Sequence, residues 1–411
     1  MPNYLSPGVY VEEVSTGPRP IEAVGTSTAA FLGVAPKAGA HLHEPLAVNN
    51  WAQFVREFSS DEAESTPLAL AVYGFFDNGG SRCFVENVGA GGNIAGKVAQ
   101  GRRQGIAALE AIDEVAIVAA PGFADAASYD ALLGHCERMK DRVAILDPPL
   151  EVGRIEDLVK AATAPVAPVK PDKPPAGGGG GAPGGAAAAG DGLRPRLSDG
   201  GYGAFYFPWI TVKDPADPTK LVNAPPSGHV AGIYARTDFT RGVHKAPANE
   251  RVSGALNVTY RITRQEQEVL NPAGVNCIRY FPDTGIRVWG ARTVAESASE
   301  WRYVNVRRLF NMVEESVGRA TRWVVFEPND MTLWKSIRRD IGAFLTRLWR
   351  SGALMGARPE DAFFVKCDDE TNPPDVIDAG QVVTLIGIAP VKPAEFIVFR
   401  IGQHAGGTQI E

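Results

Sequence analysis

The chain contains 411 residues, of which 45% are hydrophobic and 21% are charged, so it is long enough for two domains with separate cores. Its formal net charge of -6 argues against nucleic acid as a general partner. No apolar run reaches the roughly 18 residues that a membrane-spanning helix needs, and the start of the chain lacks the pattern of a secretory signal. We therefore expect a cytoplasmic protein that does not insert into a membrane.

The four cysteines are far apart in the sequence and form no CxxC motif. This pattern favours buried free thiols in a reducing compartment. The residues are Cys83, Cys136, Cys277 and Cys367.

Residues 1–24 are predicted to form an extended arm. Prolines at positions 2, 7, 18 and 20 exclude a helix, and residues 8–14 can only be extended. One interpretation is a frayed terminus, which the residues taken alone favour; the other is a strand that pairs with the sheet edge of a neighbouring subunit. The residues of this candidate strand are Gly8, Val9, Tyr10, Val11, Glu12, Glu13 and Val14.

From residue 26, strands and helices alternate, which predicts an α/β fold whose parallel or mixed sheet is covered by helices. Asn50 is a typical N-cap, and Thr66 followed by Pro67 is a typical helix start. The predicted strands cover residues 29–34, 82–88, 115–119 and 143–146. The predicted helices cover residues 51–58, 67–79, 104–112 and 126–139.

Residues 161–200 are dominated by Ala, Pro and Gly, with an unbroken glycine run at 177–181. Such a segment buries too little apolar surface to offset its ordering entropy, so we interpret it as a mobile surface insertion. Core residues resume at 202–210, and the Gly- and Pro-rich segment 225–250 is expected to cross between two domains. The elements predicted next are a helix over residues 261–270 and strands over 278–282 and 286–289.

Residues 301–352 predict a helix, a short strand and a second helix. In the first helix, apolar residues recur at helical spacing, with Arg307 and Arg308 expected on the opposite, polar side. The apolar run 323–326 is interpreted as a buried strand. Asn329 or Asp330 then caps the second helix.

The second helix carries an apolar stripe from residue 333 to 348 and ends before Gly352. Lys335, Arg339 and Arg350 fall on its polar side. Between residues 300 and 350, ten Lys or Arg residues stand against six Asp or Glu residues, the reverse of the overall balance. This reversal indicates either a solvated helix face or a basic surface that meets an acidic partner.

Three further strands are predicted near the end of the chain, at residues 362–365, 382–389 and 395–403. The last of them alternates in a two-residue period and is a second candidate for pairing with a neighbouring subunit. Its candidate residues are Phe396, Ile397, Val398, Phe399, Arg400 and Ile401.

Several segments resemble contractile tail sheath proteins, which polymerise around the inner tube of contractile phage tails and of related contractile injection systems. The resemblance covers the first forty residues or so and most of the chain from about residue 200. The segments are SPGVYVEE at 6–13, PPSGHVAGIYAR at 225–236, GVHKAPANE at 242–250, RRLF at 307–310, EES at 314–316 and WVVFEPND at 323–330.

This resemblance implies two α/β domains and a structural protein without catalytic activity, cofactor or metal. An inner domain of residues 250–403 is completed by the arm of residues 1–24, an outer domain of residues 25–249 is inserted between them, and residues 404–411 form a tail. The implied partners are further copies stacked as hexameric rings in a helical polymer, an inner tube protein, a baseplate, and tail-terminator or cap proteins.

The mechanism that the resemblance implies is contraction. Terminal strands are exchanged between subunits, a baseplate trigger releases an extended lattice, and the rings rotate and compact to drive the tube through a target envelope. Lys335, Arg339 and Arg350 are the implied tube-attachment residues, with Arg307 and Arg308 as competing candidates. A phage virion tail is the nearest alternative, and the Ala-, Gly- and Arg-rich composition favours an injection system within a phage-tail-like particle.

Two enzyme classes are weaker alternatives. Residues 91–97 fit the GxxxxGK pattern of a P-loop NTPase, but Val98 cannot supply the hydroxyl that binds Mg²⁺. Ser227 and His229 are too close in sequence to indicate a subtilisin-like hydrolase, and no GxSxG motif exists. We expect His229 and His244 to make structural hydrogen bonds. The acidic residues 368–372 lack the alternation of an EF-hand and are interpreted as a solvated loop.

Overall fold

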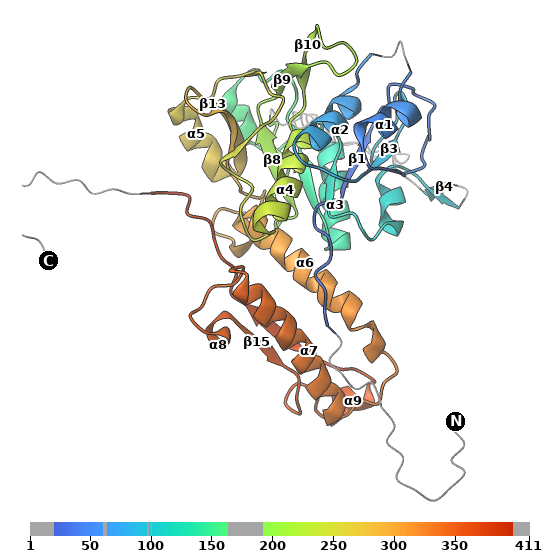
Figure 1. The fold of residues 1–411 in the computed structure, drawn as a ribbon, viewed down its shortest axis with the longest axis vertical. Coiled ribbons are helices and arrows are strands. Elements are labelled where there is room, and N and C mark those ends of the chain that lie inside the picture. The colour runs from blue at the N-terminus through green and yellow to red at the C-terminus, as the bar shows by residue number, and fades with distance from the viewer. Residues whose placement is uncertain (1–19, 61–63, 97, 100, 163–191, 398–411) are drawn as a thin grey trace, which may run out of the picture. The chain divides into compact units, whose positions relative to one another are not determined.

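The computed structural model describes residues 20–60, 64–96, 98–99, 101–162 and 192–397 (Figure 1). These residues form two compact units. The small unit contains residues 20–24 and 313–389, and the large unit contains residues 25–312 and 390–397. The division therefore falls near residue 313, and not at residue 250 as predicted, because strands on both sides of residue 250 pair in one sheet of the large unit.

A nine-stranded mixed sheet organises the large unit, in the order β11-β14-β13-β8-β7-β6-β1-β3-β2. Strands β13, β8, β7, β6, β1 and β3 run parallel, whereas β2, β14 and β11 are antiparallel to their neighbours. The bounds are β1 Ala29–Gly33, β2 Leu46–Val48, β3 Cys83–Asn87, β6 Ile117–Ala119, β7 Val143–Leu146, β8 Gly203–Phe207, β11 Glu250–Arg251, β13 Val275–Phe281 and β14 Gly285–Trp289. Two smaller sheets contain β9 Ile210–Lys213, β10 Leu221–Ala224 and β12 Asn257–Val258, and β4 Val98–Ala99 with β5 Arg102–Arg103.

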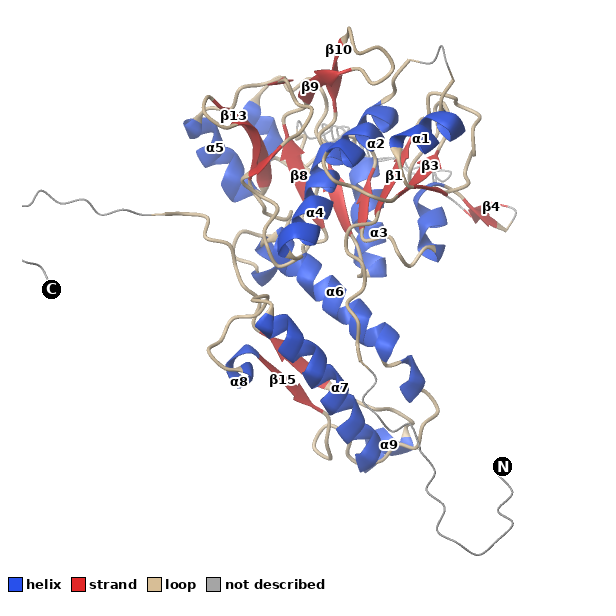
Figure 2. Ribbon diagram, viewed as in Figure 1, coloured by secondary structure: helices blue, strands red, loops and turns tan. Residues whose placement is uncertain are grey.

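Helices cover both faces of this sheet, which confirms the predicted α/β class (Figure 2). In β1, Ala29 and Phe31 belong to one apolar core, and Ala30 and Leu32 belong to the other, as the two-residue period of a strand requires. One core includes α1 Trp51–Phe58, α2 Pro67–Asp77 and α4 Ser227–Arg241. The other core includes η1 Gly105–Ala111, α3 Ala126–Met139, η2 Ile155–Val159 and α5 Arg264–Leu270. Two further 3₁₀ helices of the large unit are η3 Asn271–Ala273 and η4 Glu300–Arg302.

The predicted helix caps are confirmed at the first two helices. The Asn50 side chain accepts a hydrogen bond from the Gln53 N–H at 2.8 Å, and the Thr66 hydroxyl accepts one from the Ala69 N–H at 3.3 Å. All four cysteines are buried and free, as predicted. No helix within the described ranges is both long and apolar enough to cross a membrane.

The segment 225–250 does not cross between domains, because most of it is the buried helix α4. Pro226 precedes α4 and has no side chain that can cap it. The Asp147 carboxylate, at the end of β7, takes this role: it accepts the Ser227 N–H at 2.8 Å and the Ser227 hydroxyl at 2.6 Å. Burial raises the pKa of Asp147 to about 7, although both hydrogen bonds oppose this shift.

The predicted insertion at 161–200 is narrower in the structure. Residues 163–191 lie outside the described part, but the residues on both sides of them are held together. The Ala162 N–H donates to the Arg194 carbonyl at 2.7 Å, and the Leu193 N–H donates to the Asp157 carbonyl at 2.8 Å. Ser198 also donates its hydroxyl to Glu137 at 2.7 Å. Residues 192–200 therefore belong to the fold.

The small unit combines a long helix with a two-stranded sheet. Asp330 caps α7 by accepting the N–H groups of Thr332 and Leu333 at 2.9 and 2.8 Å, and Gly352 has a φ of 80°, which confirms both predicted ends. The elements are η5 Arg322–Val324, α7 Met331–Arg350, α8 Pro359–Ala362, β15 Phe363–Lys366, α9 Pro374–Asp378 and β16 Leu385–Ile388. The boundary between the two units falls within α6 Val304–Ala320.

The predicted strand at 323–326 is wrong. Residues 322–324 form a short 3₁₀ turn, Val325 is 64% exposed, and Phe326 is fully exposed with a φ of 70°. Four apolar residues carry no periodicity, so a buried strand and an exposed turn cannot be told apart from this run alone.

Arg307 and Arg308 are not on a polar helix face, contrary to prediction. Arg308 forms a buried ion pair with Asp238 of α4, with Nη1 at 2.9 Å from Oδ1, and also donates to the Thr26 carbonyl. The Arg307 guanidinium lies 4.2 Å from the centre of the Trp301 ring and donates to Asn311 at 2.7 Å. Helical spacing alone could not reveal that buried partners would be available to both cations.

We predict that the Asp238→Asn substitution lowers the free energy of unfolding by about 3 to 5 kcal/mol, because Arg308 then stays buried without a compensating charge. Urea unfolding of the full chain measures this. The control is Glu114→Gln, which breaks the exposed Arg82 pair at 2.9 Å and is expected to cost at most about 1 kcal/mol. Equal losses in the two variants would contradict the prediction.

We predict that deletion of residues 165–190 changes the free energy of unfolding by no more than about 1 kcal/mol, because loop closure depends only weakly on loop length. A longer deletion, of residues 165–198, is expected to destabilise the chain, since it also removes the Arg194 hydrogen bond to Ala273 and the Ser198 hydrogen bond to Glu137. Indistinguishable unfolding curves for the two deletions would show that residues 192–198 are dispensable.

Candidate functional site

The structure does not assemble the residues of a hydrolase around Ser227. The Ser227 hydroxyl is fully buried and donates to Asp147. His229 is 2% exposed, its Nδ1 has no hydrogen-bond partner, and burial lowers its pKa to about 4. The predicted structural hydrogen bond of His229 is therefore not made through Nδ1, and the packing of its ring against Gly74 of α2 explains its burial.

The glycine loop after β3 has a structural explanation. A Cβ on Gly92 would lie 1.9 Å from the Val88 carbonyl oxygen, so this position needs glycine for the close turn of the loop. Lys97, the last residue of the GxxxxGK pattern, lies outside the described residues. The acidic residues 368–372 form a local turn in which Asp368 accepts the Thr371 N–H at 3.3 Å. No group of three or more potential metal ligands occurs among the described residues.

The two-stranded sheet of the small unit is the first candidate assembly surface. Strands β15 and β16 pair antiparallel, with Phe364 opposite Gly387, and within the described ranges neither strand has a second strand partner. Both outer edges therefore carry backbone donors and acceptors that no strand among the described residues engages. Such an edge is a ready template for a strand from another chain.

Apolar side chains are also exposed on this small sheet. Phe364, Leu385 and Ile386 are 59%, 50% and 36% exposed. Gly387 allows the Phe364 ring to lie across the backbone of β16, since a Cβ on this glycine would be only 2.1 Å from the ring. A two-stranded sheet is marginal alone, and here α7 packs against β15.

The sequence did predict β15 and β16 as apolar strands, but it did not identify them as a sheet whose edges could pair with a strand from another chain. The sequence held no signal for this role, because three strands were predicted in the part of the chain that forms the small unit, at residues 323–326, 362–365 and 382–389.

The predicted terminal strands lie mostly outside the described part of the chain. This applies to Gly8, Val9, Tyr10, Val11, Glu12, Glu13 and Val14, and to Val398, Phe399, Arg400 and Ile401. Phe396 and Ile397 are described: they belong to no strand and are 74% and 75% exposed. Two consecutive large apolar side chains exposed in this way are a second candidate surface.

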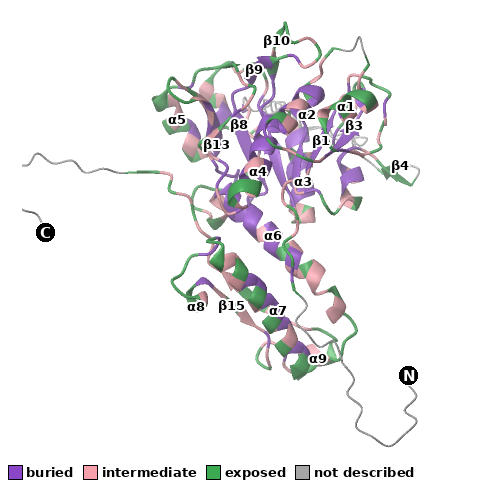
Figure 3. Cartoon of the chain, viewed as in Figure 1, coloured by how far each residue is buried: buried purple, intermediate pink, exposed green. Residues whose placement is uncertain are grey.

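The polar face of α7 is the third candidate surface. Lys335, Arg339 and Arg350 are exposed, and helical spacing places them on the opposite side of α7 from its buried residues. Figure 3 shows that α7 carries both exposed and buried residues along its length. Arg339 donates to Asp340 at 3.0 Å. Gly342, on the same side, has no atom within 4 Å of the position of a Cβ, so another backbone can approach there. Arg307 and Arg308 do not contribute to this surface, because both are buried.

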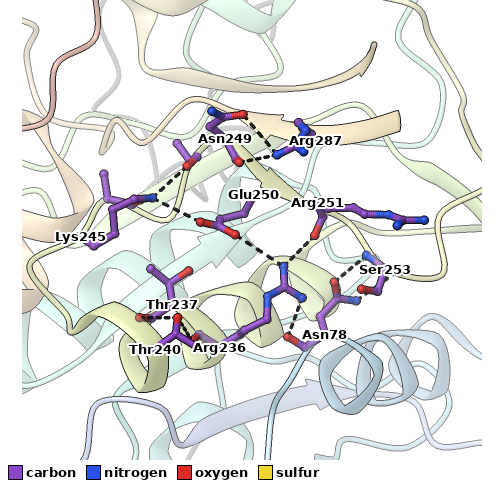
Figure 4. A network of polar contacts seen from close by, with 12 residues as sticks. Asn78, Arg236, Thr237, Thr240, Lys245, Asn249, Glu250, Arg251, Ser253 and Arg287 are labelled. Carbon is purple, nitrogen blue, oxygen red and sulfur yellow. Dashed lines mark hydrogen bonds and ion pairs between the residues drawn. The ribbon is translucent and has the colours of Figure 1, made fainter. Parts of the chain in front are cut away.

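The segment 242–250 has an architectural role in the large unit (Figure 4). Lys245 donates to the carbonyls of Ala246 and Ala248 at 2.6 and 3.1 Å and pairs with Glu250 at 3.4 Å. From α4, Arg236 donates to the Arg251 carbonyl at 2.8 Å. These contacts tie the short edge strand β11 to α4, so this segment positions a sheet edge.

The sequence matches two family models in succession. Residues 99–294 match the phage tail sheath protein central domain, and residues 296–403 match the phage tail sheath C-terminal domain. The tail sheath protein of Vibrio phage KVP40 is 30% identical over 43% of this chain and 26% of its own length, and that of Enterobacteria phage T4 is 28% identical over 46% and 28%. The matches thus span about a quarter of the length of these two relatives.

Solved structures match over nearly the whole chain. The sheath complex of PVC, an extracellular contractile injection system in the contracted state, aligns with a TM-score of 0.75 and 28% identity over 98% of this chain and 99% of that chain. The contracted helical sheath of the anti-feeding prophage aligns with a TM-score of 0.70 and 29% identity over 98% and 100%. This chain therefore belongs to the phage tail sheath family and is a structural sheath protein.

Proposed function

We propose that this chain is the sheath subunit of a phage-tail-like contractile injection system. Its copies polymerise as stacked hexameric rings around an inner tube and contract to drive that tube through a target envelope. The observation that carries the proposal is the small sheet, whose two outer edges have no strand partner among the described residues. The near full-length similarity to sheaths of contractile injection systems supports it.

The proposed link between subunits is strand exchange. The edges of β15 and β16 accept residues 8–14 and 396–401 of neighbouring copies, and main-chain hydrogen bonds supply the affinity. Each hydrogen bond contributes only about 0.5 to 1.5 kcal/mol net, but two strands per subunit make the sum large. Such a link can persist while the bodies of the subunits rotate, because the arms act as hinges between them.

The proposed attachment to the tube is electrostatic. The exposed cations Lys335, Arg339 and Arg350 meet an acidic surface of the tube protein, and Gly342 lets its backbone approach. Each exposed ion pair is worth only about 0.2 to 1 kcal/mol, so the contact is strong only by repetition and can break during contraction. The similarity to a chain of the anti-feeding prophage baseplate, with a TM-score of 0.68, supports contact with a baseplate; terminator or cap proteins complete the proposed partners.

Two alternatives are less well supported. A phage virion tail sheath would share every feature above, and capsid and packaging genes beside the gene would distinguish it. The two injection-system sheaths align over 98% of the chain at 28 and 29% identity, which favours the injection system. A hydrolase lacks support, because the Ser227 hydroxyl is buried against Asp147. An NTPase lacks support, because Val98 follows the GxxxxGK pattern in place of Ser or Thr. The proposed source of energy for contraction is therefore new contacts between subunits.

Deletion of residues 1–14 is expected to leave a folded monomer that cannot polymerise, because one acceptor edge of β15–β16 then receives no strand. Circular dichroism measures folding, and negative-stain electron microscopy measures polymers. The full chain is expected to form tubular polymers without ATP or peptide turnover. The variant lacking residues 165–190 is the control, since it keeps both arms and should still assemble. Normal tubes from the arm deletion would refute strand exchange by the N-terminal arm.

Replacement of Lys335, Arg339 and Arg350 together by Glu is expected to abolish co-assembly with the tube protein while sparing contacts between subunits. The physical reason is like-charge repulsion against an acidic tube surface. The measurement is imaging of tube-filled sheaths at several salt concentrations. The control replaces three exposed cations of the large unit, Lys37, Lys213 and Arg251, by Glu. This control should change neither co-assembly with the tube protein nor its salt sensitivity. Tube-filled sheaths with unchanged salt sensitivity would exclude this face of α7 as the attachment surface.

A further inference from the structure

A polar cluster in the large unit holds the chain just before its C-terminal arm. The Glu395 carboxylate accepts hydrogen bonds from Nε and Nη2 of Arg292 at 2.9 and 2.7 Å. It also accepts the side-chain amide of Asn271 at 2.8 Å and the hydroxyl of Tyr303 at 3.1 Å. Each carboxylate oxygen therefore has two donors, and these come from three separate segments of the large unit. We call these four residues the clasp.

The clasp is a largely buried ion pair. The side chains of Arg292 and Glu395 are 8% and 19% exposed. Burial raises the pKa of Glu395, but the hydrogen bonds from Arg292 and Asn271 and the charge of Arg292 outweigh it, so this pKa lies below its ordinary value. Arg292 also donates to the Asn271 carbonyl and to the Ser297 hydroxyl, each at 3.2 Å. The carboxylate is thus ionised at neutral pH with its acceptor sites occupied.

Among the described residues, the polar contacts that hold this segment end at Glu395. Upstream, the Asn305 side chain donates to the Val391 carbonyl at 3.1 Å. Immediately downstream, Phe396 and Ile397 are largely exposed and belong to no strand. The clasp therefore lies at the junction between the body of the large unit and the arm.

We propose that the clasp fixes the residue at which the C-terminal arm leaves the large unit, and so positions the arm for a second copy of this chain. This inference rests on the proposed function. Glu395 is the only charged residue between Lys392 and Arg400, whereas residues 396–399 of the arm are all apolar. Apolar contacts alone would tolerate a slip of two residues. If the chain shifted by two residues, Glu395 would leave the clasp, and Arg292 would stay buried without a counter-charge.

A buried ion pair suits such a positioning role better than a stabilising one. Its desolvation cost offsets much of its attraction, and its best-attested use is to fix register. Glu395 and Arg292 are therefore positioning residues: their loss should affect the arm and assembly more than the global fold.

The test is Glu395→Gln in the full chain, followed by hydrogen exchange and polymer yield. Exchange of peptides covering residues 390–397 should rise about tenfold, that of β13 should stay unchanged, and the yield of polymers should fall several-fold. Tyr303→Phe removes one donor and should give a smaller change of the same sign. The control is Glu137→Gln, which breaks a comparable two-bond contact with Arg196, at 2.9 and 2.7 Å, away from the arm.

Unchanged exchange of residues 390–397 together with unchanged polymer yield in Glu395→Gln would overturn the inference. Hydrogen exchange that rises as much in β13 as in residues 390–397 would also overturn the inference, because the Arg292–Glu395 pair would then stabilise the whole large unit. If the unmodified chain forms no polymers but exchange rises only at residues 390–397, the proposed function fails while the anchoring role of the clasp stands.

Discussion

Backbone N–H and C=O groups on the outer edges of β15 and β16 are the constraint on which the rest of the account depends. Within the described part of the chain no strand pairs with either edge, and apolar side chains are exposed on the same sheet. Backbone polar groups need partners, and a two-stranded sheet is marginal alone. The proposed function treats the sheet of the small unit as incomplete and assigns its missing strands to other copies of the chain.

The large unit is self-sufficient by comparison. Its nine-stranded sheet is covered on both faces, and its internal segments are joined by buried polar contacts, such as Asp238 with Arg308 and Asp147 with Ser227. These contacts suit a body that keeps its shape while it moves. In the proposed mechanism the contacts that change during contraction are at the surface of the subunits, in the arms and the weak charged contacts. The large units move as rigid bodies.

The local structure of this chain was largely predictable from its sequence. The helix over residues 126–139 and the strand over residues 143–146 are confirmed to the residue, because each begins or ends at strong local signals such as Asp125 and Asp147. The N-caps Asn50, Thr66 and Asp330 are confirmed for the same reason. Short-range patterns carry this information, since capping and periodicity involve residues only a few positions apart.

The errors share a different origin, which is contact between residues far apart in the sequence. Arg308 was placed on a polar face because Asp238, 70 residues earlier, could not be foreseen as its partner. The domain boundary was placed at 250 because nothing local reveals that β13 pairs with β8 across a long connection. The clasp was missed for the same reason, since Glu395 and Arg292 are 103 residues apart. The candidate arms and the basic face of α7, by contrast, were visible as local patterns.

The most direct test of the central claim is a cryo-electron microscopy structure of the assembled polymer at a resolution that traces the backbone. The account predicts that β15 and β16 become the middle of a four-stranded sheet, whose outer strands are residues 8–14 and 396–401 of other copies. A polymer in which β15–β16 remains two-stranded, with subunits joined only through their side chains, would contradict it.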